Sequence, residues 1–188
     1  MIRRLHHNAY RCRSSEETRA FYEDFLGLRL AGTLEITETK SGRRTETLHT
    51  FYELGDGSYL AFFEAPDMPF DFKAQHDYDL HIALEVDAAT LQDMLARGKK
   101  AGVETRGVSD HGFIHSIYFR DPNGYVIELT AKTPEHDRAM DPAVNGAREK
   151  LIRTTSGGPA SGPPSGPDPA SAGRAGGAGR PCAPRFHP

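Results

Sequence analysis

The 188-residue chain predicts an α+β fold in which two βαβββ modules form a curved, open-barrel cleft. The first observation is a repeat, because a His followed two residues later by Ala opens both halves, at His7-Asn8-Ala9 and at His81-Ile82-Ala83. The second is that one helical pattern and three strand-like runs follow each opening segment. The third is that a four-stranded sheet with one helix leaves its other face bare. Two such sheets are therefore expected to curl around a ligand cleft.

The first copy opens with an alternating strand-like segment over 5–12. A helix is expected next, because Ser14 and Glu17 fit a capping box and apolar residues recur at helical spacing up to Gly27, a suitable C-terminal cap. Three strands are expected over 28–37, 45–54 and 58–65, with a hairpin turn at Asp56-Gly57.

The second copy repeats this order, with an opening strand over 80–86 and a helix capped by Asp87. Leu91, Met94 and Leu95 form the apolar face of that helix, and Gly98 or Gly102 is expected to end it. The three strands are expected over 104–108, 113–119 and 125–131, with a turn at Asp121-Pro122-Asn123-Gly124 between the last two.

The composition indicates one globular domain over 1–135, with modules at about 3–67 and 78–132. A Gly/Pro/Ala-rich tail over 136–188 is expected to be disordered, because such a segment cannot bury enough apolar surface to offset its chain entropy. The formal net charge of -3 argues against a nucleic-acid partner, and no apolar run is long enough to span a membrane. Two cysteines and no visible secretory signal favour a reducing cytoplasm.

A divalent-metal site is the main chemical prediction, with His7, His81 and Glu128 as ligands. The two His occupy the same place in the two copies, so both are expected to point into the shared cleft. Glu128 lies within an apolar strand, where an acid is costly to bury unless it is paired or bound to a metal. Two His and one carboxylate form a facial set that leaves metal positions open for substrate, water or dioxygen.

The chain resembles the vicinal oxygen chelate superfamily, which includes glyoxalase I, the bleomycin- and fosfomycin-resistance proteins, methylmalonyl-CoA epimerase and the extradiol dioxygenases. The resemblance covers about residues 3–132 and does not fix the reaction, because one scaffold hosts many chemistries. The motifs that carry it are Leu5-His6-His7, Phe21-Tyr22-Glu23-Asp24-Phe25-Leu26-Gly27-Leu28, Leu80-His81-Ile82-Ala83-Leu84-Glu85-Val86 and Tyr118-Phe119-Arg120-Asp121-Pro122-Asn123-Gly124-Tyr125-Val126-Ile127-Glu128-Leu129.

The residue at the fourth metal position distinguishes the enzyme classes that the resemblance allows. Glyoxalase I-like members carry a second Glu in the last strand of the first module, whereas alignment on the turns places Ala61 opposite Glu128 here. Glu64 lies three residues further on, so a regular strand turns it to the other face, and only a bulge could bring it back. A three-ligand site is therefore expected. It matches the extradiol dioxygenases, in which Fe(II) binds a catecholate and dioxygen.

Candidate proton-transfer residues follow from the same comparison. Tyr118 resembles the Tyr that bonds the substrate oxygen in extradiol enzymes, although the acid/base His of those enzymes is missing from the first module here. His115 or His111 could supply that function. By strand alternation His115 lies on the opposite face from Tyr118, so a regular strand cannot place both in the cleft.

Three functions remain open at this point. The first is an extradiol-type Fe(II) dioxygenase acting on a small catechol-like molecule. The second is a glyoxalase I-like lyase or isomerase that uses Ni, Zn or Mn as a Lewis acid. The third is a drug-sequestering protein of the resistance type, which the retained ligand set disfavours. The modules could close on each other or swap with a second chain, so a homodimer is a possible assembly.

Overall fold

The computed structural model describes residues 1–156, and the rest of the expected tail lies outside the described residues. The chain divides into two compact units, Met1–Asn145 and a second unit that begins at Gly146. Helix α5 (Ala147–Ser156) belongs to the second unit. Within the described residues, no helix is long and apolar enough to cross a membrane.

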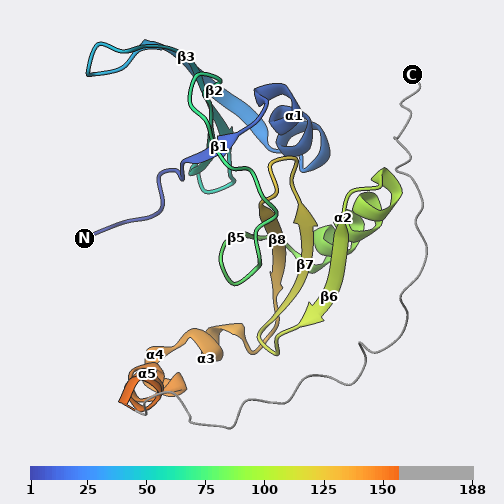
Figure 1. The fold of residues 1–188 in the computed structure, drawn as a ribbon. Coiled ribbons are helices and arrows are strands. Elements are labelled where there is room, and N and C mark those ends of the chain that lie inside the picture. Colours follow the sequence, from blue (N-terminus) through green and yellow to red (C-terminus); the bar gives the residue numbers. More distant parts are fainter. Residues whose placement is uncertain (157–188) are drawn as a thin grey trace, which may run out of the picture. The chain divides into compact units, whose positions relative to one another are not determined.

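Module one comprises strand β1 (Tyr10–Cys12), helix α1 (Ser15–Arg19), the π-helical turn η1 (Ala20–Phe25) and three further strands (Figure 1). These strands are β2 (Arg29–Glu38), β3 (Arg44–Glu53) and β4 (Tyr59–Glu64). The sheet order is β1-β4-β3-β2, with β1 parallel to β4 and the other pairs antiparallel.

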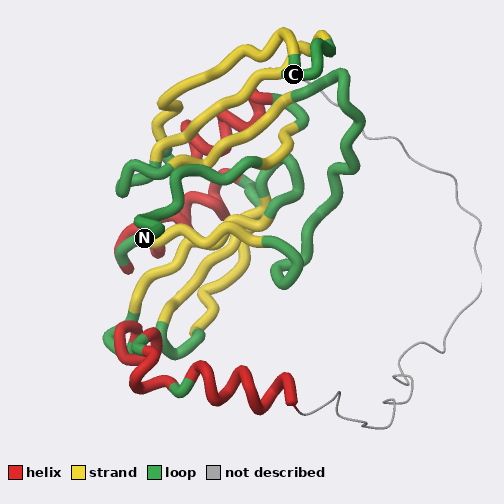
Figure 2. Tube along the Cα trace, turned by 90° about the vertical axis from the view of Figure 1, so that its left-hand side faces the viewer, coloured by secondary structure: helices red, strands yellow, loops and turns green. Residues whose placement is uncertain are grey.

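Module two has the same order of elements, with β5 (His81–Glu85), α2 (Ala88–Ala101), β6 (Thr105–Asp110), β7 (Ile114–Arg120) and β8 (Val126–Lys132). Its sheet order is β5-β8-β7-β6, with β5 parallel to β8. Figure 2 shows the strands of the two modules as two separate groups. The predicted α+β class and the repeated βαβββ order are both confirmed.

Local signals explain most helix boundaries. The hydroxyl of Ser14 accepts a hydrogen bond from the backbone N–H of Glu17, which caps α1. The carboxylate of Asp87 accepts one from the N–H of Thr90 and caps α2. Gly102 ends α2 with a φ of 70°, in the left-handed region that favours glycine.

The structure differs from expectation at the start of module one, where the opening strand is short. His7 forms only an isolated parallel bridge with Tyr59. The side-chain oxygen of Asn8 accepts a hydrogen bond from the backbone N–H of Ala61, at 2.7 Å. A side-chain acceptor thus replaces the backbone carbonyl that a continuous parallel strand would offer, and regular pairing begins only at Tyr10.

A second difference concerns residues 136–156, which were expected to belong to the disordered tail. They form α3 (His136–Met140), α4 (Pro142–Asn145) and α5. The compositional argument applies to the Gly- and Pro-rich residues that follow, whereas this stretch contains residues that favour helices, such as Ala, Arg, Glu and Leu. Helical structure therefore continues beyond residue 136, where the composition predicts the tail to begin.

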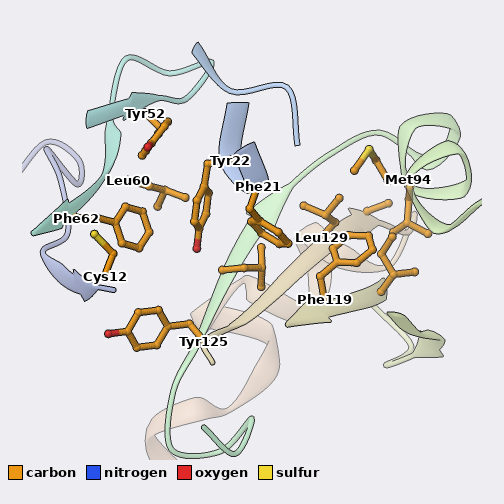
Figure 3. Close-up of a cluster of buried hydrophobic side chains, with 14 residues drawn as sticks. Cys12, Phe21, Tyr22, Tyr52, Leu60, Phe62, Met94, Phe119, Tyr125 and Leu129 are labelled. Atoms are coloured by element: carbon orange, nitrogen blue, oxygen red, sulfur yellow. The ribbon is translucent and has the colours of Figure 1, made fainter. Parts of the chain in front are cut away.

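One hydrophobic core connects both modules (Figure 3). The buried ring of Tyr22 lies 4.7 Å from the ring of Phe62, and Phe25 contacts Phe119 of module two edge-on at 5.2 Å. The core also contains Leu91 and Met94 of α2, so the face predicted for that helix is confirmed. The core-facing sides of both sheets therefore share one interior with α1, η1 and α2.

The β7–β8 turn fixes module two against module one through polar contacts. The buried carboxylate of Asp121 accepts hydrogen bonds from the hydroxyl of Tyr22 and from the backbone N–H groups of Asn123 and Tyr125. The side chain of Asn123 accepts from the N–H of Arg13 and donates to the carboxylate of Asp121. This turn therefore provides specific contacts where the apolar core alone would give little orientation.

Candidate metal site

The candidate residues lie on the sheet faces that point away from the shared core. Successive residues of a strand point to opposite faces, so the neighbours of core residues point outward. In module one, Leu60 and Phe62 face the core and Ala61 faces away. In module two, Ile127 and Leu129 face the core and Glu128 faces away. Each module therefore carries its own outward face, on the side opposite the core.

His81 and Glu128 are brought together on the outward face of module two. The Nε2 atom of His81 lies 3.3 Å from Oε2 of Glu128. The His81 side chain is 41% exposed, whereas that of Glu128 is 7% exposed. The pair thus combines a buried carboxylate with an imidazole that can meet a ligand from solvent.

The tautomer of His81 follows from its second contact. Its Nδ1 atom lies 2.6 Å from the backbone carbonyl oxygen of Asp77. Because a carbonyl can only accept, Nδ1 carries the proton, and in the neutral ring Nε2 presents a lone pair toward Glu128. A lone pair facing a carboxylate is repulsive unless a cation lies between them or the imidazole is protonated.

The pair has a separation suitable for two ligands of one ion. Metal–ligand distances of about 2.0 to 2.2 Å, with angles of about 90° to 109° at the ion, correspond to N···O separations of about 2.8 to 3.6 Å. The observed 3.3 Å lies within this range. Two donors alone do not complete a site. No group of three or more His, Cys, Asp or Glu side chains within residues 1–156 is arranged to hold a metal.

Tyr118 and His111 extend the polar cluster beside the pair. The hydroxyl of Tyr118 donates a hydrogen bond of 3.4 Å to Oε1 of Glu128 and lies 2.9 Å from Nε2 of His111. Burial, followed by the charge of Glu128, raises the pKa of Tyr118, so the phenol stays protonated near neutral pH. His111, Tyr118 and Glu128 therefore form a continuous hydrogen-bonded path.

A depression of about 430 Å³ opens beside these residues. Arg106 lies in its wall, and its guanidinium group lies 5.0 Å from the centre of the Tyr118 ring. Its volume lies within the range of ligand pockets, about 300 to 1,000 Å³. The complete lining is Asp77, Tyr78, His81, Arg106, Ser109, His111, Phe113, Ile114, Tyr118 and Glu128.

His7 lies on module one and is not brought to His81 and Glu128 within the chain. Its ring contacts His6, His49 and Phe51, and it does not line the depression. It nevertheless occupies the position in module one that His81 occupies in module two. The parallel bridges join His7 to Tyr59 and His81 to Val126.

The same registers confirm that Ala61 is the counterpart of Glu128, because each lies two residues beyond its bridge partner. Across the next strand pair, Phe51 of β3 is opposite Ala61 as Tyr118 of β7 is opposite Glu128. Module one thus presents Ala61 and Phe51 where module two presents Glu128 and Tyr118. The acid and the Tyr of the candidate site both lie on the outward face of module two.

Glu64 and His115 lie apart from this cluster. The carboxylate of Glu64 accepts a hydrogen bond of 2.6 Å from the backbone N–H of Ser15, at the start of α1. His115 pairs with Asp110 at 3.5 Å and does not line the depression. Of the two His that could assist Tyr118, His111 lies beside its hydroxyl and His115 does not. The structure therefore brings His111, rather than His115, into contact with Tyr118.

Residues 4–129 match the sequence model of the Glyoxalase/Bleomycin resistance protein/Dioxygenase superfamily. The chain belongs to this superfamily. The matched residues span both modules as far as Leu129 of β8 and include every candidate ligand, so the resemblance to this superfamily is confirmed. No curated protein is similar enough to the chain to count as a match.

Solved structures of the superfamily share the fold at low sequence identity. A glyoxylase/bleomycin resistance protein/dioxygenase domain from Frankia sp. EAN1pec is 18% identical with a TM-score of 0.56, over 71% of this chain and 100% of that one. The fosfomycin resistance protein FosX from Listeria monocytogenes, complexed with Mn(II) and sulfate, is 23% identical with a TM-score of 0.54, over 73% and 98%. A glyoxalase/dioxygenase from Nostoc punctiforme is 22% identical with a TM-score of 0.53, over 70% and 92%.

Proposed function

We propose that this chain is a divalent-metal enzyme that acts on a small organic substrate, with His81 and Glu128 as two of its three protein ligands. The observation that carries the proposal is the His81–Glu128 pair, whose 3.3 Å separation and imidazole tautomer suit a shared cation. The adjoining depression of about 430 Å³ has room for a small molecule.

His7 is proposed as the third ligand, supplied by a second copy of the chain. It occupies the place equivalent to His81, yet both candidate faces point away from the core that the two modules share. Closing one module over the other within the chain would require breaking that core. A second copy can instead place the His7 face of its module one against His81 and Glu128.

A bound ion would supply an electrophilic centre that lowers the pKa of attached oxygen groups, or an Fe(II) centre for dioxygen. The chain's own residues would handle the protons. Tyr118 can donate a hydrogen bond to a substrate oxygen beside Glu128, and His111 can exchange the Tyr118 proton with solvent because its ring is on the exposed side.

We favour extradiol-type cleavage of a catechol-like molecule with Fe(II) as the reaction. The support is the three-ligand pattern, in which Ala61 stands where a second acid would be, together with the Tyr118–His111 pair. A Lewis-acid reaction without dioxygen is the second candidate. It is favoured by the structural similarity to FosX, which was crystallised with Mn(II).

The first test is metal content. Protein purified anaerobically and loaded with Fe(II) or Mn(II) is expected to retain the ion, and Glu128→Gln is expected to lose it at unchanged circular dichroism. Glu104→Gln, which removes a surface partner of Arg120, is the matched control. Full metal occupancy in Glu128→Gln would contradict the site.

The second test separates the two reactions. The Fe(II) protein is expected to consume oxygen with a panel of catechols, with appearance of ring-cleaved product. Metal-dependent turnover of a non-aromatic substrate by the Mn(II) protein, without oxygen uptake, would instead establish the second candidate.

A further inference from the structure

The segment between the modules leads directly into the candidate site. This inter-module linker, residues 65–80, ends immediately before His81, and its Asp77 supplies the carbonyl that accepts the Nδ1 proton of His81 at 2.6 Å. With 41% of its side chain exposed, His81 has few packing contacts to fix its ring. The position of the Asp77 backbone therefore determines which nitrogen of His81 faces Glu128.

The side chain of Asp77 is held in turn by Arg106 of β6. Nη2 of Arg106 donates to both carboxylate oxygens of Asp77, at 2.7 and 2.9 Å. The same guanidinium lies over the ring of Tyr118. A single side chain from β6 thus contacts both the residue that orients His81 and the Tyr that donates to Glu128.

We propose that Arg106 and Asp77 are positioning residues for the metal site. Their ion pair fixes the end of the linker so that the Asp77 carbonyl keeps the proton on Nδ1 of His81, and Nε2 stays free to bind a cation. Residues that hold a metal-binding imidazole through its other nitrogen orient the ring. Removing such residues typically weakens metal affinity by about 10- to 100-fold. This inference rests on the proposed metal site.

Two variants test the contact from both sides. Asp77→Ala removes the carboxylate but keeps the backbone carbonyl, and Arg106→Ala removes its partner. Arg106→Lys keeps the positive charge and is expected to be intermediate. Asp67→Ala is the matched control, because Asp67 lies on the same linker and pairs with Arg43 and Thr45 of module one.

The first measurement is Co²⁺ binding by calorimetry and by visible absorption of the bound ion. We expect wild type and Asp67→Ala to bind alike, and Asp77→Ala and Arg106→Ala to bind at least tenfold more weakly with a changed spectrum. Thermal melting of each variant checks that the fold is kept. Wild-type affinity and spectrum in both test variants would overturn the proposed positioning role while leaving the metal site intact.

The second measurement needs no metal. Proton–nitrogen NMR of the imidazole is expected to report a single Nδ1-protonated tautomer for His81 in wild type and a mixture in Asp77→Ala and Arg106→Ala. An unchanged tautomer in both variants would overturn the proposal. If wild type fails to bind Co²⁺, the proposed metal site is contradicted. The NMR measurement still decides whether Arg106 and Asp77 orient His81.

Discussion

His111 lines the depression of the candidate site and is linked to Glu128 through the hydroxyl of Tyr118. The 2.9 Å contact between the two side chains and the 3.4 Å bond from Tyr118 to Glu128 make a path from an exposed imidazole to a buried carboxylate. His115, four residues along the chain, pairs with Asp110 instead. These two His therefore make a natural comparison, because they share chemistry and exposure and differ in contact with the site.

We expect His111→Ala to lower turnover by about 10²- to 10⁴-fold, the usual range for loss of a proton-transfer group. His115→Ala should change turnover less than threefold. Steady-state kinetics on the substrate found by the oxygen-uptake screen would measure both. Equal losses in the two variants would contradict the assignment.

The sequence identifies part of this residue-level arrangement. His81 and Glu128 can be found because the repeat and the cost of a buried acid leave few alternatives. His111 is harder to identify, since it precedes β7 in a tight turn where Gly112 has a φ of 82°. Strand alternation does not apply there. That turn conformation directs the His111 ring back to Tyr118, and no pattern in the sequence encodes its direction.

The turn that joins β7 and β8 stabilises the whole first unit. Asp121 is 4% exposed and accepts from four donors, which are the hydroxyl of Tyr22, the amide of Asn123 and the backbone N–H groups of Asn123 and Tyr125. Removing the acceptor would leave buried donors without partners. Leaving a buried donor unsatisfied costs more free energy than removing both partners of a hydrogen bond.

Asp121→Ala is expected to reduce the free energy of unfolding by about 2 to 4 kcal/mol, measured by urea denaturation. Asp56→Ala, at the equivalent turn of module one, is the control, because its carboxylate accepts hydrogen bonds from the backbone N–H and the hydroxyl of Ser58 within its own turn. A loss in Asp121→Ala no larger than in the control would show that the turn does not hold the modules together.

The cap of α2 predicts a dependence of stability on pH. The N–H of Thr90 holds the pKa of Asp87 below its ordinary value of 3.8. A depressed folded-state pKa adds stability above the unfolded value, and this is lost as the pH falls through the folded value. The melting temperature of Asp87→Ala should therefore lie below that of wild type at pH 7, and the difference should shrink below about pH 4.

Element boundaries follow from the sequence where one residue type decides them. Ser14, Asp87 and Gly102 act as the helix caps that their chemistry predicts. The π-helical turn over Ala20–Phe25 is not predicted, because the spacing of Phe21, Tyr22 and Phe25 fits a regular helix equally well. Packing in the shared core, rather than local sequence, selects the wider turn.

The arrangement of the two modules determines where a complete metal site can form. Both outward faces are turned from the common core, so each chain has a His7 face and a His81–Glu128 face on opposite sides of that core. Two copies that each place their His7 face against the His81–Glu128 face of the other would form two equivalent sites. The sequence alone does not decide whether the two modules pair with each other within one chain or with the modules of a second chain. Both arrangements would bury the same alternating residues.

Co-expression of His7→Ala and Glu128→Ala chains with different affinity tags tests this assembly. Each variant alone is expected to lack metal. The purified mixed dimer should recover one ion per two chains, because one site combines the intact His7 of one copy with the intact His81 and Glu128 of the other. A mixed dimer without metal, or a protein that remains monomeric during gel filtration, would contradict a shared site.

Ala61 and Glu128 occupy equivalent places in two modules that repeat one pattern. A duplicated module begins with redundant copies of every position, and redundancy allows one copy to lose what the other keeps. Here one half has an acid and a Tyr where the other has Ala61 and Phe51. Equivalent places in the two halves therefore differ in chemistry: the fully buried Ala61 can contribute only packing, whereas the carboxylate of Glu128 can accept hydrogen bonds or hold a cation.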